Sequence, residues 1–406
     1  MLILLVSFQN CSTGFEGSGE GDTSSSSSST GNEPGTTPPP TAPPVTPPVI
    51  PPIQPPPVPP PVTPPVTKKA LVTVGVGVGG RIISGLNGFE TLIYDHEVFS
   101  PAEQNSIKAD PNNPNKLICP AGWMQIGSVC CLAQYECIGG GWHSDFLFRG
   151  IAFGNGHFVA VGGQIHGIVQ VSADGINWAP KINLVAQSGK VAGASTSLSW
   201  LSGVAYGKGR FVAVEGYSGK LAWSVDGINW IATGKAPAVR NTLRRIYFIG
   251  NRFYASGDNS SWGFSDDGST WSLTGYGTPA PTEVYVVGNK TYGFVGDKIY
   301  ELSSPTATSW TLVYTHSSAI GSFIYNDKAQ TFHILTGNST YVATSPSGPW
   351  TKTSVSAPGR WAHFSGEYFV GNGTFYSADA KVWRQTPSLT AASVIQQYAS
   401  GLVDIP

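Results

Sequence analysis

The 406-residue sequence has few charged residues. Lys and Arg number 23 and Asp and Glu number 24, so charged residues make up 12% of the chain, about half the share in an ordinary soluble domain. The formal net charge is −1 and no basic tract stands out. We therefore expect no nucleic-acid partner. No apolar run approaches the ~20 residues that a membrane-spanning helix needs.

Common catalytic signatures are also missing. The chain has no Gly-x-Ser-x-Gly elbow, no phosphate-binding loop and no His-Glu-x-x-His pair. Neither a cofactor nor a metal is expected from these patterns. The chain is instead rich in Gly (50 residues), Pro (32) and Trp (12), a composition that suits short strands joined by tight turns.

Cysteine is scarce and clustered. Four of the five cysteines, Cys119, Cys130, Cys131 and Cys137, lie in one short segment. In a protein outside the cytoplasm, this cluster predicts two disulfides with three possible connectivities. A zinc site is the alternative, but no His stands at ligand spacing and no pair is Cys-x-x-Cys.

The first ten residues contain a short apolar run, Leu2 to Val6, placed shortly before Cys11. This start resembles the end of a bacterial lipoprotein signal, in which the cysteine is acylated and becomes the first mature residue. Asn10 and the missing basic residues depart from that pattern. The resemblance implies an outer-membrane lipoprotein of the cell envelope, facing the surface or the periplasm, with Cys11 as the lipidation site. The alternative is an unstructured start with an unrelated cysteine.

Residues 11–66 cannot build a core. A serine run spans residues 24–29 and a proline-rich stretch spans residues 34–65. Such tracts form flexible coil and stiff polyproline II, so we predict a disordered stalk that extends on the order of 100 Å. A docking site for a proline-reading domain and a glycosylated stalk are the alternatives.

A repeat determines the predicted architecture. Three similar segments span residues 172–178, 224–230 and 265–271, each after two alternating apolar stretches separated by a tight turn. Weaker copies span residues 304–310, 345–350 and 377–383. From Trp230 to Trp350 the copies recur about every forty residues, the length of one four-stranded propeller blade.

These segments resemble the Asp-box, S-x-D-x-G-x-x-W, of sialidases and other propellers. The resemblance implies that the motif builds the turn between the third and fourth strands, away from the ligand face. We therefore predict structural roles for its Asp residues. The residues that carry the resemblance are Ser172, Asp174, Gly175 and Trp178; Ser224, Asp226, Gly227 and Trp230; and Ser265, Asp267, Gly268 and Trp271.

Residues 67–406 are accordingly predicted to be an all-β domain, a β-propeller of seven four-stranded blades. Residues 71–78 and 81–89 supply the last three strands of one blade, and residues 393–400 supply its first strand, so the C-terminus closes the ring. Six blades are the alternative. Insertions at 94–146 and 187–200 join successive blades, which places them on the face opposite the Asp-box turns.

The same alignment of repeats suggests a ligand site. Arg245, Glu283 and Arg360 fall near the start of innermost strands, where other blades have Gly150 and Gly203 and an open mouth is expected. The Arg and Glu side chains suit an acidic sugar or a carboxylate, or else form an ion-pair network. Loops of this face add His166 and Tyr217 as candidate binding residues. His363 takes the repeat position of Phe153 and is predicted to be a core residue.

Two classes of function remain. A sialidase needs three Arg, a Tyr–Glu pair and an Asp, but Arg is scarce and no Arg-Ile-Pro segment occurs. The leading hypothesis is a non-catalytic, monomeric propeller, anchored to the envelope as a lipoprotein, that binds a glycan or a protein partner. A sialidase-like glycoside hydrolase and a scaffold for outer-membrane assembly are the alternatives.

Overall fold

The computed structural model describes most of residues 68–405. Its gaps are residues 78–79, 97–107, 120–122, 127–128, 133–146, 164–165, 186–187, 217, 236–242, 258–261, 275–278, 280, 282, 305–306, 308, 338, 355–361, 372–374 and 387–394. The predicted lipidation site and stalk (residues 1–66) lie outside the described part. All the described regular elements are strands.

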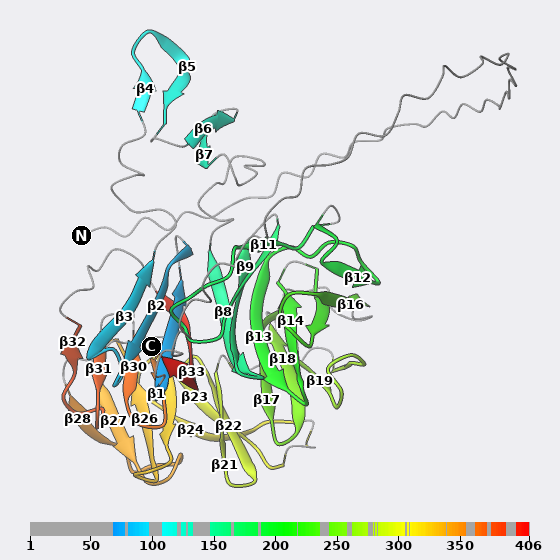
Figure 1. Ribbon diagram of the computed structural model, residues 1–406. Coiled ribbons are helices and arrows are strands. Elements are labelled where there is room, and N and C mark those ends of the chain that lie inside the picture. The colour runs from blue at the N-terminus through cyan, green and yellow to red at the C-terminus, as the bar shows by residue number, and fades with distance from the viewer. Residues whose placement is uncertain are drawn as a thin grey trace, which may run out of the picture. The chain divides into compact units, whose positions relative to one another are not determined.

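Seven of the nine described sheets follow one another around a ring (Figure 1), so the chain is a seven-bladed β-propeller as predicted. Blades 1 to 4 are β33 (Ile395–Ile405), β1 (Lys68–Gly77), β2 (Ile82–Leu86) and β3 (Thr91–His96); β8 (Phe148–Gly154), β9 (His157–Gly163), β10 (Gly167–Ser172) and β11 (Ile182–Asn183); β13 (Leu201–Gly207), β14 (Arg210–Glu215), β15 (Lys220–Ser224) and β16 (Trp230–Lys235); and β17 (Leu243–Ile249), β18 (Arg252–Gly257), β19 (Trp262–Ser265) and β20 (Ser272–Thr274).

Blades 5 to 7 keep the same order. They are β21 (Val284–Val287), β22 (Lys290–Val295), β23 (Lys298–Leu302) and β24 (Thr311–Thr315); β25 (Ser322–Asn326), β26 (Thr331–Leu335), β27 (Thr340–Ala343) and β28 (Thr351–Ser354); and β29 (Ala362–Phe364), β30 (Phe369–Gly371), β31 (Phe375–Ser377) and β32 (Arg384–Gln385). Two separate hairpins, β4 (Lys108–Asp110) with β5 (Asn113–Ile118) and β6 (Trp123–Ile126) with β7 (Val129–Leu132), precede blade 2.

The C-terminal strand closes the ring. β33 pairs antiparallel with β1 from Lys68↔Ile405 to Gly77↔Ile395, and in Figure 1 the red and blue strands lie side by side. This pairing covers the edge of β1 that would otherwise be free to aggregate. The strand continues to Ile405, beyond the predicted end at residue 400, because its last residues alternate between buried and exposed positions.

An aromatic pair sets a common register in most blades. Phe153 on the first strand of blade 2 packs on Phe158 of the second strand, with ring centroids 4.7 Å apart. Tyr206–Phe211, Phe248–Phe253, Tyr325–Phe332 and Phe364–Phe369 repeat the pair at 4.7–4.8 Å. Phe364, and not His363, therefore holds the place of Phe153, so the predicted core position of His363 was wrong by one residue.

The turns between third and fourth strands are built by their own side chains. In the turn that follows β15, the Asp226 carboxylate accepts hydrogen bonds from the backbone N–H groups of Ile228 and Asn229, both at 2.8 Å. Gly227 has φ 73°, a conformation open to glycine at no steric cost. Its carbonyl accepts from the Trp230 indole N–H at 3.0 Å. The turns at residues 172–178 and 265–271 repeat these bonds.

The insertions are only partly described. β3 runs to His96, so residues 94–96 belong to blade 1 and not to the insertion predicted at 94–146. Cys119 takes part in a disulfide, while Cys137 lies outside the described residues, so the predicted pairing of the four cysteines stays a prediction. Between blades 2 and 3, β12 (Val191–Gly193) pairs parallel with β16 as a fifth strand. Nothing in the Gly/Ser-rich sequence indicated that strand.

Candidate functional site at the start of the innermost strands

All seven innermost strands begin at the same end of the propeller. Neighbouring strands within a blade are antiparallel. The turn between the third and fourth strands therefore lies at the opposite end from the start of the first. The face at which β8, β13, β17, β21, β25, β29 and β33 begin is the candidate ligand face. The predicted separation of this face from the Asp226-type turns follows from the pairing.

One position recurs around this face. It lies four residues before the residue at which the first strand makes its last pair with the second strand, as Gly154 does with His157 and Val287 with Lys290. The residues at this position are Gly150, Gly203, Arg245, Glu283 and Ser322. Gln397 holds the same place on β33. A Cβ at Gly401, four residues later, would lie 2.5 Å from the Phe153 ring, just as one at Gly154 would lie 1.9 Å from Tyr206.

Side chains at this position point at the next blade. A Cβ at Gly150 would lie 2.8 Å from the Gly203 Cα, and one at Gly203 would lie 3.4 Å from the backbone nitrogen of Ile246. The two glycines thus let β8, β13 and β17 approach closely. The expectation that they leave the mouth open was wrong, because absence of a side chain here brings neighbouring backbones together.

The larger side chains at this position border a cavity. It encloses about 250 Å³ between β17, β21, β29 and β33, and we call it the axial cavity. Arg245 and Glu283 line it. The other polar and aromatic groups on its wall are Tyr247, Tyr285, His363, Gln396, Gln397 and Tyr398.

Hydrogen bonds at this level also join neighbouring blades. Gln397 Oε1 accepts from the Ile151 backbone N–H at 3.3 Å, and Ser322 Oγ accepts from the Ala362 N–H at 2.9 Å. The Glu283 carboxylate accepts from the Phe323 N–H in the same manner. One role of the Glu283 carboxylate is therefore structural, since this hydrogen bond connects blade 5 to blade 6.

The second oxygen of Glu283 has no hydrogen-bond partner, although it is buried. Burial raises the pKa of this carboxyl to about 8, while the charge of Arg245 and the Phe323 N–H oppose the rise. Glu283 is therefore mainly protonated at neutral pH and can donate a hydrogen bond from the cavity wall.

Arg245 supplies the positive charge of the cavity. Its Nη1 donates to the Ser202 carbonyl at 3.5 Å. Among the described ion pairs, none joins Arg245 to Glu283. The ion pair considered from the sequence is therefore not formed between these two residues, because their charged ends lie more than 4 Å apart.

Tyr247, Tyr285 and His363, which also line the axial cavity, are uncharged at neutral pH. Burial raises the pKa of Tyr247 and of Tyr285, and the nearby Glu283 adds to the rise at Tyr285. Burial also lowers the pKa of His363 to about 4. Its Nε2 lies 3.3 Å from the Ser400 hydroxyl. Arg245 is thus the cation among the described wall residues.

Other predicted residues are not brought to this wall. His166 is half-buried in the loop between β9 and β10, on the same face but outside the cavity lining. Tyr217 and Arg360 lie outside the described residues. The sequence missed Tyr247, Tyr285 and Gln397. Tyr247 and Tyr285 stand two residues after Arg245 and Glu283, a signal that the sequence already contained. The equivalence of Gln397 to Gly150 needed the register of β33.

Comparisons with known proteins add little. No protein-family model and no curated protein matches the chain. Similar solved structures include YCF48 from Cyanidioschyzon merolae (16% identity, 59% of this chain, 85% of that chain, TM-score 0.42) and YCF48 bound to D1 peptide (14%, 59%, 80%, 0.44). Virginiamycin B lyase from Staphylococcus aureus is another (11%, 60%, 86%, 0.47). At such TM-scores these similarities carry no argument about function.

No three His, Cys, Asp or Glu side chains gather as metal ligands within the described part of the chain. The same part contains no helix of the length and apolarity required to cross a bilayer.

Proposed function

We propose that the propeller is a non-catalytic binding module that takes an acidic group of a glycan or protein partner into the axial cavity. The observation that carries this proposal is the unpartnered, buried oxygen of Glu283, a residue that lines the same cavity as Arg245. A buried polar atom without a partner is costly. A ligand carboxylate would give Glu283 an acceptor and Arg245 a counter-charge.

The charge state of the wall favours an anionic ligand. At neutral pH Arg245 is charged, while Glu283, His363 and the tyrosines are neutral for the reasons given above. The amides of Gln396 and Gln397 can both donate and accept. A few convergent polar groups on an aromatic wall are the usual composition of a small-ligand site.

The setting of the module belongs to the same proposal. The lipoprotein-like start with Cys11 and the proline-rich residues 34–65 suit a propeller held away from an outer membrane. The turns at Ser172, Ser224 and Ser265 have the hydrogen bonds that an Asp-box needs, which supports relatedness to Asp-box propellers. A stalk that provides reach serves recognition of a fixed partner better than hydrolysis of a diffusing substrate.

A glycosidase is the second candidate, because Tyr247 and Tyr285 stand beside Glu283. A tyrosine nucleophile needs a lowered pKa and an adjacent base. In this cavity, the pKa values of both tyrosines are raised and Glu283 is protonated at neutral pH. These directions favour binding over nucleophilic catalysis.

A glycan array tests the proposal, with the full chain carrying Cys11→Ser to prevent acylation. We expect retention of acidic glycans and their loss in Arg245→Ala. Arg252→Ala is the matched control, because Arg252 is in the same blade but pairs with Asp266 near the opposite face. A parallel assay with a fluorogenic sialoside separates the two candidates. If the wild type hydrolyses the sialoside and Glu283→Gln does not, the protein is a glycosidase and not a non-catalytic binding module.

A further inference from the structure

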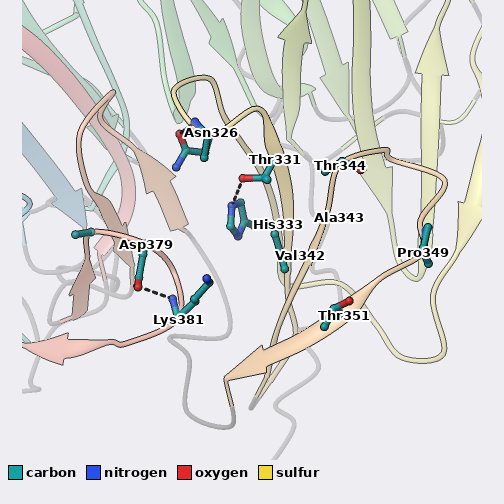
Figure 2. A pocket seen from close by; sticks show the side chains of 12 residues that line it. Asn326, Thr331, His333, Val342, Ala343, Thr344, Pro349, Thr351, Asp379 and Lys381 are labelled. Atoms are coloured by element: carbon teal, nitrogen blue, oxygen red, sulfur yellow. Dashed lines mark hydrogen bonds between the residues drawn. The ribbon is translucent and has the colours of Figure 1, made fainter.

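A second cavity lies on the opposite face of the propeller, between blades 6 and 7. It encloses about 520 Å³ and we call it the inter-blade cavity. Its walls come from β26, β27 and β28 of blade 6 and from the turn after β31 of blade 7 (Figure 2). No residue of the axial cavity contributes to it.

The residue that distinguishes this place is His333. His333 is the third residue of the second strand of its blade, the position that Val159 holds in blade 2 and Val212 in blade 3. In those blades the valine meets the turn of the following blade: a Cβ at Gly227 would lie 2.5 Å from Val159, and one at Gly268 would lie 2.7 Å from Val212. Blades 4 and 5 have Tyr254 and Tyr292 at this position, and blade 6 has an imidazole ring where blades 2 and 3 make a tight apolar contact.

The His333 ring is held firmly but incompletely paired. The side chain is 97% buried, with 3% relative exposure, and packs edge-on against Phe369 with centroids 4.8 Å apart. Its Nε2 lies 2.9 Å from the Thr331 hydroxyl, whereas its Nδ1 has no hydrogen-bond partner. Figure 2 shows the ring between its own strand and the turn that carries Asp379 and Lys381. Burial lowers its pKa to about 4, so the ring is neutral near pH 7.

The other walls are mostly apolar or already engaged. Val342, Ala343 and Pro349 supply methyl and ring surfaces. The Asp379 carboxylate is committed to its own turn, where it accepts from the backbone N–H groups of Lys381 at 2.8 Å and Val382 at 3.1 Å. Lys381, the other charged residue of the lining, is exposed. We therefore expect a ligand of this cavity to have an apolar body and no net charge, because burying an unpaired charge is costly.

We propose that the inter-blade cavity is a binding site for a small uncharged molecule with an apolar body and a hydroxyl group, which pairs with His333 Nδ1. A hydroxyl both donates and accepts, so it fits either tautomer of the neutral ring. The volume lies within the range of small-molecule pockets. This site is independent of the axial cavity and of the acidic ligand proposed there.

Ligand-observed ¹⁹F NMR on the full chain with Cys11→Ser tests the proposal, with 4-fluorophenol as the probe and 4-fluorotoluene as its analogue without the hydroxyl. We expect 4-fluorophenol to bind about threefold to tenfold more tightly, the usual range for one hydrogen bond. His333→Phe should keep the ring and remove that difference. The same loss should not occur in His157→Phe, since His157 is an exposed residue at the start of β9 in blade 2.

A second pair of variants keeps the test valid if His333→Phe does not fold. Ala378→Trp adds a ring at an exposed position on the cavity rim, and Ala173→Trp adds one at the equivalent exposed position of the blade 2 turn. Ala378→Trp should lower binding of both probes at least fivefold while Ala173→Trp should not. Absence of 4-fluorophenol binding to the wild type, equal binding of both probes, or binding that survives Ala378→Trp would each overturn the proposal.

Discussion

At the scale of single residues, Glu283 combines two duties. One oxygen accepts from the backbone of the next blade, and the other is buried without a hydrogen-bond partner. The protein tolerates that unpaired oxygen because burial keeps the carboxyl protonated, with its pKa raised to about 8. Ionisation is therefore expected to affect both stability and ligand binding.

The pH dependence of stability follows from this pKa. A carboxyl with a folded-state pKa of about 8 and an unfolded pKa near ~4.3 binds more protons when folded, so its stabilising effect is full below the unfolded value and is lost as pH rises through about 8. The fall in melting temperature from pH 6 to pH 9 should be larger in the wild type than in Glu283→Gln. Equal falls would mean that Glu283 is already ionised at pH 6.

Asp226 shows the opposite behaviour. Partial burial would raise its pKa, but hydrogen bonds from the Asn229 and Ile228 backbones and from the Asn229 and Ser224 side chains lower it to about 2. The stability that this carboxylate contributes is present above an unfolded pKa of ~3.9 and is lost as pH falls toward about 2.

Replacement of Asp226 should therefore weaken the fold and spare the ligand site. We expect Asp226→Ala to lower the free energy of unfolding by about 1–2 kcal/mol, since it removes several turn hydrogen bonds. Denaturant melts measure this change. Binding per folded molecule should be that of the wild type, because the turn lies at the other end of the blade. If Asp226→Ala instead lost ligand binding while its denaturant melt matched that of the wild type, the assignment of the ligand face to the start of the innermost strands would be wrong.

At the scale of elements, the innermost strands determine where the ring is tight. β33 passes close to blade 2, where a Cβ at Gly401 would lie 2.5 Å from the Phe153 ring. The aromatic pair Phe153–Phe158 fills that space and repeats in other blades. Closure of the ring thus depends on a glycine as well as on the ladder between β33 and β1.

Gly401→Ala should destabilise the propeller by about 1–3 kcal/mol, because overpacking forces the Phe153 ring or the strand to move. Gly337→Ala is the matched control, since nothing lies within 4 Å of its Cβ position and its loop is exposed. Chemical denaturation of the two variants gives the comparison. A neutral Gly401→Ala would show that β33 is not tightly packed against blade 2.

The sequence predicted the strands and blades well, but it predicted the register within a blade and the packing between blades less well. The spacing of Trp230, Trp271 and Trp350 predicted blades because each blade repeats its own local turn chemistry. The same alignment misplaced His363 by one residue, because the turn glycine of blade 7, Gly366, stands at the position of Asn155 and not of Gly156. The inter-blade cavity was not predictable, because it depends on what the next blade places opposite His333.

At the scale of the whole molecule, the proposal places the propeller on a stalk anchored through Cys11. We expect mass spectrometry of the N-terminal peptide to find diacylglycerol on Cys11, and Cys11→Ser to release the protein from membranes, because residues 12–66 offer no other anchor of sufficient apolarity. An unmodified peptide that retains Met1 would contradict the lipoprotein hypothesis.

The most direct test of the proposed function is isothermal titration with the strongest acidic glycan from the array. The proposal predicts that Arg245→Ala loses about 1.5–3 kcal/mol of binding free energy, the usual range for a hydrogen bond to a charged group. Arg252→Ala should bind like the wild type, and so should a variant in which a short linker replaces residues 100–143. If Arg245→Ala binds normally while that deletion abolishes binding, the cysteine-containing insertion is the recognition element and the axial cavity is not.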